Sequence, residues 1–444
     1  MPRTGCRSPL SWFAGPLLVS SLAAQQFSTA DRQLAVAKIW AGARTNYAYN
    51  DRVRADWDSA LTATLALATA RQSDFQLYHR LRRMIALLND GTAAIVPAAA
   101  LRGRIARPPL ELVSFEDRVF IADYAPNDEM RIARPERLAE IVAVQGIPTG
   151  TWIRDSVLPD IGGATPEARW HRAVAQMLEG EKGTAVHLQL RSPHPSADER
   201  GASVTRTISL DERWPFTRPA LEVDTLPGGI AWVRLNSLAD PNAPAVFDRT
   251  FPDFTKVTGV ILDLRENTGA GGGRDDGYRI LSRLMNRAFV TSRWRTALYR
   301  PALQGIDMPD SAGAWVVGVP DTIRPRQDRP AFTGPVAVLT SPRTAGVAED
   351  LLVAFRSAGR GSIIGETSAG SSGQVFSVSL PHGWAFLVCV SREAFPDGTE
   401  FAGIGVMPEV PVTVTVEDFL AGRDAVLDRA QEWMRERMAA NPRR

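Results

Sequence analysis

Apolar residues near the start of the chain recur at the spacing of amphipathic helices. Between Thr29 and about Asn89 the pattern repeats in successive segments, the clearest of which carries Leu77, Leu81, Met84, Ile85 and Leu88. Residues three and four apart lie on one face of an α-helix, so these positions predict a buried helical face. Asn89-Asp90-Gly91 is a helix-stop signal. We therefore predict an N-terminal helical region over residues 28–100.

Short alternating runs of apolar and polar residues follow between Pro109 and about Ile208. They predict strands at 119–121, 141–144 and 185–190, with a helical segment at 170–178 before the last of them. The order of strand, glycine-containing turn, helix and strand resembles a PDZ-like peptide-binding module. A plain β-rich insert is the equally weighted alternative. We assign this β-rich module to residues 109–210.

From about Leu221 the apolar runs become continuous, which is typical of parallel strands covered on both faces. The runs alternate with helical segments, which predicts an α/β core over residues 220–415 and a closing helical tail over 416–444. Strands are expected at 229–233, 260–264, 336–339 and 362–364, helices at 274–285, 346–357 and 416–438, and a hairpin at 376–390.

The α/β core is organised around the stretch from Gly334 to Gly359. A buried strand ends in a tight turn, and an amphipathic helix follows in which Val347, Leu351 and Phe355 are four residues apart. The N-terminus of a helix favours developing negative charge, so this corner suits the nucleophile of an acyl-transfer site. The residue at the corner is Gly346, which has no side chain.

Residues 1–24 have the pattern of a secretory signal peptide. Arg3 and Arg7 flank the start of the segment, the apolar run 10–22 follows, and small residues suited to cleavage end it. We therefore predict an exported protein, periplasmic or extracellular, with a ragged N-terminus or a membrane anchor as the alternative. Neither this apolar run nor any later one is long enough to span a bilayer.

Removal of this segment takes two of the 51 basic residues and none of the 49 acidic ones, leaving 51 − 2 = 49 of each. A net charge near zero gives no reason to expect nucleic acid or a membrane surface as a partner. Cys389 becomes the only cysteine, which excludes an intrachain disulfide in the mature chain. The five histidines are scattered without metal-ligand spacing, so no metal site is predicted.

The strand VILDLREN and the TGAGGG after it invite comparison with nucleotide-binding loops. No G-x-G-x-x-G frame fits, because Arg274 or Asp276 stands where a glycine is required, and no G-K-[ST] follows. We therefore expect no nucleotide and no other cofactor. A glycine-rich turn after a strand can instead present backbone N–H groups to an oxyanion.

Five motifs in a fixed order resemble the tail-specific (C-terminal-processing) serine peptidase family, which includes the tricorn core and the repeats of interphotoreceptor retinoid-binding protein. They are LNDGTAAIVP, VILDLREN-TGAGGG, VLTSPRTAGVAED, IIGETSAGSSGQ and FPDGTEFAGIGVMPE. The resemblance covers roughly residues 29–96 and 221–415. It implies the α/β peptidase core of that family, with the β-rich module where many members carry a PDZ-like one.

The resemblance leaves no confident catalytic residue. Gly346 stands at the position of the family's nucleophilic Ser, Thr92 at that of the general-base His, and Ala402 at that of a partner Glu. In the branch that pairs Ser with Lys, Ser371 stands at about the place of the Lys, and no lysine lies near any motif. A glycine cannot form an acyl-enzyme, and a threonine hydroxyl is no useful base near neutral pH.

The frame of the site nevertheless matches the family. The resemblance places one oxyanion N–H at Gly269 or its neighbour Ala270 and the other at Val347, and Glu349 is expected to be structural. A relocated nucleophile would have to be one of the hydroxyls in the neighbouring turns, Ser341, Thr344, Ser368, Ser371 and Ser372. The bases expected nearby are Glu349, Glu366 and Glu400, and a carboxylate is a poor base for a serine.

Two functions follow from these residues. The first is a catalytically impaired peptidase homologue that binds a peptide, a protein C-terminal segment or a small apolar ligand in the old cleft. The second is an active exported serine-type hydrolase that uses a relocated pocket serine. The family's catalytic residues are replaced at Thr92, Gly346 and Ala402, which favours the first function. A fold alone does not decide the chemistry, so the residues of the site carry more weight than the family's activity.

Overall fold

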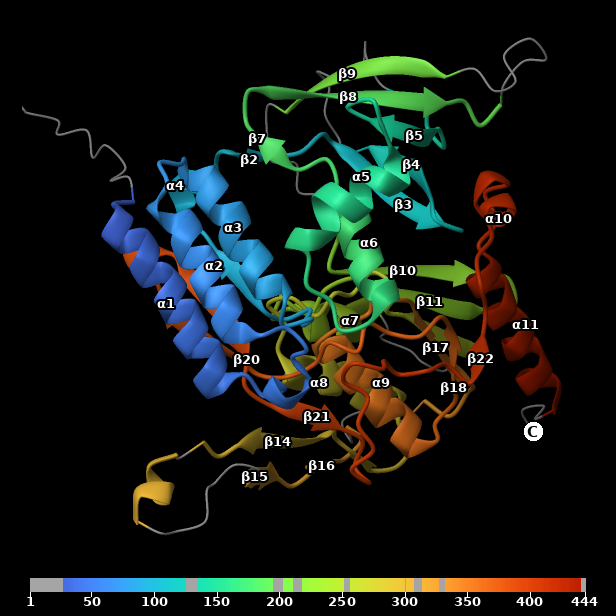
Figure 1. Ribbon diagram of the computed structural model, residues 1–444. Coiled ribbons are helices and arrows are strands. Elements are labelled where there is room, and N and C mark those ends of the chain that lie inside the picture. The colour runs from blue at the N-terminus through green and yellow to red at the C-terminus, as the bar shows by residue number, and fades with distance from the viewer. Residues whose placement is uncertain are drawn as a thin grey trace, which may run out of the picture.

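The computed structural model describes residues 27–124, 135–194, 203–210, 218–250, 256–299, 301–306, 314–326 and 332–440. Three parts are visible in Figure 1: a group of N-terminal helices, a β-rich module above, and an α/β core beneath it. The predicted signal peptide lies outside the described residues. None of the described helices combines the length and the hydrophobicity needed to cross a bilayer.

The α/β core is built on a six-stranded sheet whose strands follow the order β10-β11-β12-β17-β18-β22. From β11 onward neighbouring strands are parallel, and β10 is antiparallel to β11 at the edge. The strand bounds are Leu221–Leu226 (β10), Ile230–Leu235 (β11), Gly259–Asp263 (β12), Val336–Thr340 (β17), Ser362–Gly365 (β18) and Val410–Pro411 (β22).

Helices cover both faces of this sheet, which confirms the prediction made from the continuous apolar runs. Alternate strand residues face opposite sides, so Val260 and Leu262 pack with the helices on one face and Ile261 packs on the other. The first face carries α7 (Ala243–Thr250), α8 (Arg274–Leu284) and α9 (Val347–Ala358), and the second carries α11 (Ala425–Ala440).

The N-terminal helices share their hydrophobic core with a hairpin from the far end of the chain. Strands β1, β20 and β19 form a small antiparallel sheet, and Phe386 and Val388 of β20 pack against Val36 and Leu81 of the helices. The bounds are Thr29–Asn46 (α1), Trp57–Thr69 (α2), Asp74–Ala86 (α3), Ala94–Val96 (β1), Ala99–Arg102 (α4), Val375–Ser379 (β19) and Ala385–Cys389 (β20). Capping boxes begin α1 at Ser28 and α3 at Ser73.

The β-rich module has a hydrophobic core of its own. Its sheet runs β3-β4-β5-β8-β9, so β3 is an edge strand, and helix α6 packs against β3. The helix begins at Pro166 after the N-cap Thr165, four residues before the predicted start. The bounds are Ile105–Ala106 (β2), Leu110–Phe115 (β3), Arg118–Tyr124 (β4), Glu140–Val144 (β5), Ile147–Pro148 (β6), Thr149–Trp152 (α5), Pro166–Gln176 (α6), Gly180–Glu181 (β7), Thr184–Arg191 (β8) and Val204–Leu210 (β9).

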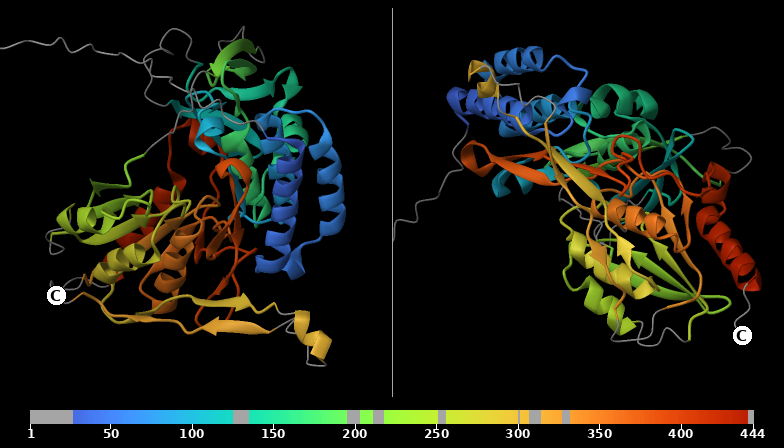
Figure 2. Two further views of the ribbon diagram at one scale, coloured as in Figure 1. Left: turned by 90° about the vertical axis from the view of Figure 1, so that its left-hand side faces the viewer. Right: turned by 90° about the horizontal axis from the view of Figure 1, so that it is seen from below.

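A two-stranded arm extends away from the core (Figure 2). It consists of β14 and β15, and β14 also pairs with β21 at the base of the arm. Its bounds and those of the short strands beside it are Phe289–Val290 (β13), Arg293–Ala297 (β14), Trp315–Gly318 (β15), Thr322–Ile323 (β16) and Arg392–Ala394 (β21).

The closing tail departs from the single helix predicted over 416–438. It forms α10 (Val416–Leu420) and α11, separated by a turn at residues 421–424. Gly422 adopts a φ of 69° in this turn, which a helix does not tolerate and which a glycine adopts without strain. The break allows α11 to pack flat on the core sheet through Trp433 and Met434.

Candidate functional site

The corner between β17 and α9 has the geometry of a nucleophile position but carries no side chain. Gly346 lies there with a φ of 57° and a ψ of −129°, a conformation that L-residues rarely adopt. Its N–H donates to the carbonyl of Ser371 over 2.9 Å. A Cβ added at this position would meet Gly269 Cα at 3.3 Å, so a small side chain fits after a slight adjustment.

The glycine-rich turn after β12 approaches this corner closely. A Cβ on Gly269 would lie 2.3 Å from the carbonyl oxygen of Ala345, which explains why only glycine fits there. The N–H of Gly269 donates to Asn267 Oδ1 over 3.0 Å, and Asn267 in turn donates to the carbonyl of Leu235. The amide of Gly269 is therefore already occupied. Of the two residues expected to supply this oxyanion donor, Gly269 or Ala270, the amide of Ala270 is the one left without an acceptor among the described contacts.

Two backbone N–H groups remain as candidate oxyanion donors. Among the described contacts, the amides of Ala270 and Val347 have no acceptor. Ala270 is exposed and Val347 is the first residue of α9, where the N-terminal amides of a helix are free to bind an anion.

Glu349 holds the loop that follows β18. Its carboxylate is fully buried and accepts hydrogen bonds from Ser368 Oγ at 2.5 Å, Gly370 N at 2.7 Å and Ser371 N at 2.9 Å. Burial raises the pKa of Glu349 to about 7, against the effect of these three donors. With both oxygens engaged by this loop, Glu349 has the structural role expected of it.

Thr92 lies in a turn that packs against the same loop. Its N–H and its hydroxyl donate to Asp90 Oδ1 over 2.8 and 2.9 Å. Burial raises the pKa of Asp90. A Cβ on Gly91 would lie 2.3 Å from Ser371 Oγ, so this turn and Ser371 are in direct contact.

The segments that carry the three family positions meet in space. Asp90, Ser371 and Ala402 line one cavity of about 470 Å³, and Ser371 in turn accepts the hydrogen bond from Gly346. The turn of Thr92, the corner of Gly346 and the segment of Ala402 therefore lie close together around Ser371. Within the described part of the chain, no three His, Cys, Asp or Glu side chains form a group that could hold a metal ion.

The candidate replacement hydroxyls do not have the partners of a nucleophile. Ser341 donates to the carbonyl of Arg265 over 2.7 Å, and Thr344 donates to that of Leu264 over 2.9 Å. Ser368 donates to Glu349, and Ser372 makes a long 3.5 Å contact with Asp350. Only Ser371 Oγ has no hydrogen bond among the described contacts, and no histidine or lysine lines its cavity.

Both carboxylate oxygens of Glu400 form ion pairs. One of its carboxylate oxygens pairs with Arg52 and the other with Arg295, and Arg52 also donates to the carbonyl of Ala402 over 2.7 Å. Neither oxygen is therefore free to accept a proton from a serine. Glu400 therefore ties the segment of Ala402 to the N-terminal region and the arm.

A buried charge cluster behind the corner escaped prediction. Arg274 donates to Asp350 over 2.8 Å and to Glu393 over 2.9 Å, and Ser292 Oγ bridges the same two carboxylates. Burial raises the pKa of Asp350 to about 7. The sequence signal for this charge cluster is the pair Glu349-Asp350 at the start of a mostly apolar helix, because buried acids need partners.

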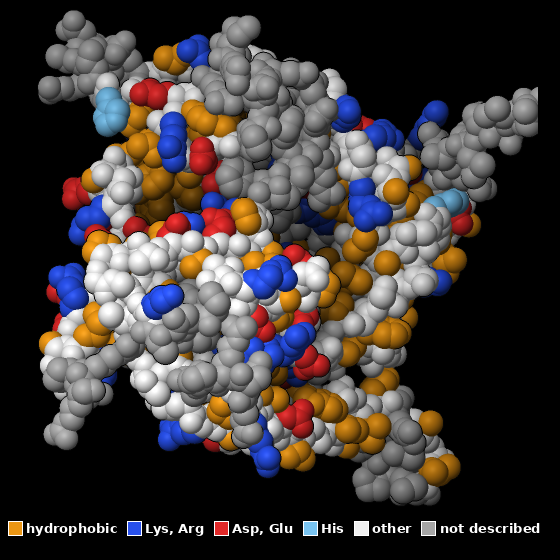
Figure 3. Space-filling view, turned by 180° about the vertical axis from the view of Figure 1, so that it is seen from behind, with side chains coloured by type: hydrophobic (Ala, Val, Ile, Leu, Met, Phe, Trp, Pro, Cys, Tyr) orange, Lys and Arg blue, Asp and Glu red, His pale blue; other side chains and the backbone are white. Residues whose placement is uncertain are grey.

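Two further cavities lie along the edge strand β3, between the module and the core. One, of about 470 Å³, is lined by Leu112 and Phe115 of β3, His171 of α6 and core residues that include Ser341 and Glu366. The other, of about 500 Å³, lies at the start of β3 and reaches Ala270. On the back of the molecule, hydrophobic side chains line a hollow between the module and the core (Figure 3).

The core matches a known peptidase family in sequence. Residues 229–412 match the model described as peptidase family S41. The chain is 26% identical over 290 residues to carboxyl-terminal-processing peptidase 2, chloroplastic, of Arabidopsis thaliana, a match that covers 62% of this chain and 50% of the relative. It is 25% identical over 419 residues to carboxyl-terminal-processing peptidase 3, chloroplastic, of the same plant, covering 89% and 72%. The chain thus spans half the length of the first relative and most of the second.

Solved structures share the fold. Mature CPAF superposes with a TM-score of 0.71 at 16% identity, covering 93% of this chain and 98% of that one. The photosystem II D1 C-terminal processing protease gives 0.50 at 21% identity, covering 87% and 94%. The match over residues 229–412 therefore confirms the predicted resemblance to this peptidase family, and the solved structures confirm the predicted α/β fold.

Proposed function

We propose that the protein is an S41 peptidase homologue that binds an extended peptide or a protein C-terminal segment and has lost most or all hydrolytic activity. One observation carries the proposal: Gly346 occupies the strand-to-helix corner without a side chain, while the hydrogen bonds around the corner are intact. A serine peptidase needs a hydroxyl there to form the acyl-enzyme. The relatives named as carboxyl-terminal-processing peptidases support the choice of ligand.

The shape of the cleft supports an extended peptide. Five consecutive residues of β3, from Glu111 to Phe115, line the cavity beside it, although alternate side chains of a strand point to opposite faces. The backbone of this edge strand therefore borders the cavity itself. A peptide strand can add to such an edge through main-chain hydrogen bonds, with pockets that select its side chains.

A relocated hydrolytic site at Ser371 is the second candidate function. Ser371 Oγ lines the same cavity as Asp90 and Ala402 and has no hydrogen bond within the described residues. Asp90 already accepts two hydrogen bonds from Thr92, so this candidate lacks a free base.

Labelling of the purified full chain with a fluorophosphonate probe separates the two candidates. We expect no specific adduct, because no serine of the site is activated. An adduct that is lost in Ser371→Ala and kept in Ser59→Ala, a change on an exposed face of α2, would overturn the binding-only proposal. Binding itself is tested with pools of free-carboxylate nonapeptides on the immobilised protein.

We also propose that the protein is exported, on the basic and apolar pattern of residues 1–24. N-terminal sequencing of protein recovered from the periplasm or medium is expected to begin near residue 25. Recovery of the intact N-terminus from the cytoplasm would exclude export.

A further inference from the structure

One carboxylate that lines the cavity between β3, α6 and the core has no partner among the described residues. Five acidic and five arginine side chains line it. Every one of the arginines forms an ion pair, namely Arg137, Arg218, Arg265, Arg343 and Arg423. Four of the acids are engaged in these pairs. Among the described contacts, the carboxylate of Glu366 has neither a hydrogen bond nor an ion pair.

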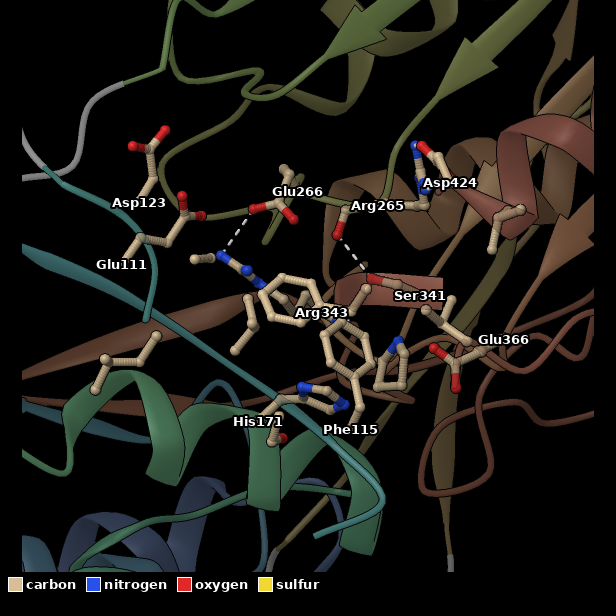
Figure 4. A pocket seen from close by; sticks show the side chains of 18 of the residues that line it. Glu111, Phe115, Asp123, His171, Arg265, Glu266, Ser341, Arg343, Glu366 and Asp424 are labelled. Atoms are coloured by element: carbon tan, nitrogen blue, oxygen red, sulfur yellow. Dashed lines mark hydrogen bonds and ion pairs between the residues drawn. The ribbon is translucent and has the colours of Figure 1, made fainter. Parts of the chain in front are cut away.

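Glu366 and His171 approach this cavity from different elements, the end of β18 and helix α6 (Figure 4). Burial, together with the charge of Arg343, lowers the pKa of His171 to about 4, so the imidazole is neutral at physiological pH. It therefore cannot compensate the charge of Glu366. Burial alone raises the pKa of the Glu366 carboxyl.

Part of the cavity lining is apolar. Leu112 and Phe115 come from β3, and Phe419 comes from α10. Glu366 is partly buried, and withdrawing a carboxylate from water without a partner is costly. A cation that arrives with an apolar stem removes that cost while its stem packs on the apolar residues of the cavity. A lysine or arginine side chain has this combination of an aliphatic stem and a charged tip.

We propose that this cavity is a specificity pocket for a basic side chain of the bound peptide, with Glu366 as the residue that accepts its ammonium or guanidinium group. This inference rests on the proposed function, because a peptide added to the edge of β3 would direct one side chain into the cavity. Ser341 lines the same cavity, but its hydroxyl already donates to the carbonyl of Arg265 over 2.7 Å and accepts from the N–H of Arg343 over 3.1 Å.

The test compares lysine with norleucine, which has the same straight aliphatic chain without the ammonium. Nonapeptide pools with a free C-terminus carry either residue fixed at one position and random residues elsewhere. Peptides retained on the immobilised full-length protein are quantified by mass spectrometry. At one position we expect lysine to be enriched about tenfold over norleucine, the effect of one charged hydrogen bond.

The variant Glu366→Gln is expected to abolish this preference while other positions keep theirs. Glu417→Gln is the matched control, because Glu417 is exposed on α10 and does not line the cavity. The preference in the wild type should grow as rising pH ionises Glu366. A lysine preference that survives Glu366→Gln, or peptide binding without any lysine preference, would overturn the proposed specificity pocket and leave the proposed peptide binding intact. No retention of any pool overturns both the pocket and the proposed function.

Discussion

A serine introduced at position 346 would enter a corner that is already shaped for it. A Cβ there meets Gly269 at 3.3 Å, and the amides of Ala270 and Val347 have no acceptor among the described contacts. The partners of the serine are nevertheless missing, because Thr92 donates to Asp90 and Glu400 is paired with two arginines. The departures from the family's catalytic residues are therefore distributed over several positions.

We predict that Gly346→Ser alone gives little hydrolysis, roughly a thousandfold or more below an active serine peptidase, because Thr92 stands at the position of the family's general-base His. The free energy of unfolding should fall by about 1–2 kcal/mol, since a φ of 57° strains a residue with a Cβ. Peptide hydrolysis and chemical denaturation measure the two effects.

Gly346→Ala is the control for this variant, with the same backbone strain and no hydroxyl. The combination Gly346→Ser, Thr92→His and Ala402→Glu should exceed the single serine variant, because Asp90 would then orient the new imidazole. Substantial hydrolysis by Gly346→Ser alone would show that the chain supplies a base from another residue.

At the scale of elements, helix α9 begins with two buried acids that titrate in the physiological range. Asp350 packs with Arg274, Ser292 and Glu393, and burial raises its pKa to about 7 from an ordinary value of 3.8. The folded state thus retains a proton that the unfolded chain loses near pH 4. The contribution of this group to the free energy of unfolding is therefore greatest below about pH 4 and falls as the pH rises to about 7.

We predict that the free energy of unfolding decreases between about pH 4 and 7 by up to roughly 1.4 kcal/mol per pH unit for each such group, with no further change above pH 7. Chemical denaturation across this range measures the slope. Asp350→Asn should reduce it and Glu417→Gln should not. An unchanged slope in Asp350→Asn would assign the effect to Glu349, whose pKa is also raised to about 7.

The elements that sequence reasoning located well are those whose signal is local. The runs 260–264 and 336–339 are apolar at every position because helices cover both faces of the parallel sheet, and both are strands. The corner at Gly346 was located by its motif, and the turn of Thr92 and the segment of Ala402 lie close to it, around Ser371.

The rest depended on contacts that no local pattern encodes. The amide of Gly269 is occupied because a turn brings it back to Asn267, and the pattern does not distinguish this from a free N–H. The helical tail is broken by one residue, Gly422. The partner of the N-terminal helices is a hairpin about 300 residues away, and the unpartnered Glu366 stands out only when every arginine around it is accounted for.

At the scale of the whole molecule, the three parts differ in how far they depend on one another. The β-rich module has a core formed by its own residues, such as Ile121, Ile141 and Leu188. The N-terminal helices instead share their core with Phe386 and Val388 of the hairpin in the α/β segment. Removal of these helices would expose that hairpin, whereas removal of the module would not.

We therefore predict that a fragment of residues 104–219 folds alone and that a fragment of residues 219–444 does not, although the latter contains the whole of the family match. Fragment 104–219 should unfold cooperatively in urea. Fragment 219–444 should have low solubility or be digested rapidly by protease, because its hairpin exposes to water the apolar residues that the N-terminal helices cover in the full chain. The chain of residues 27–444 is the positive control. Cooperative unfolding of fragment 219–444 at the urea midpoint of the full chain would show that the shared core contributes little, and that the N-terminal helices are an accessory layer on an independent peptidase fold.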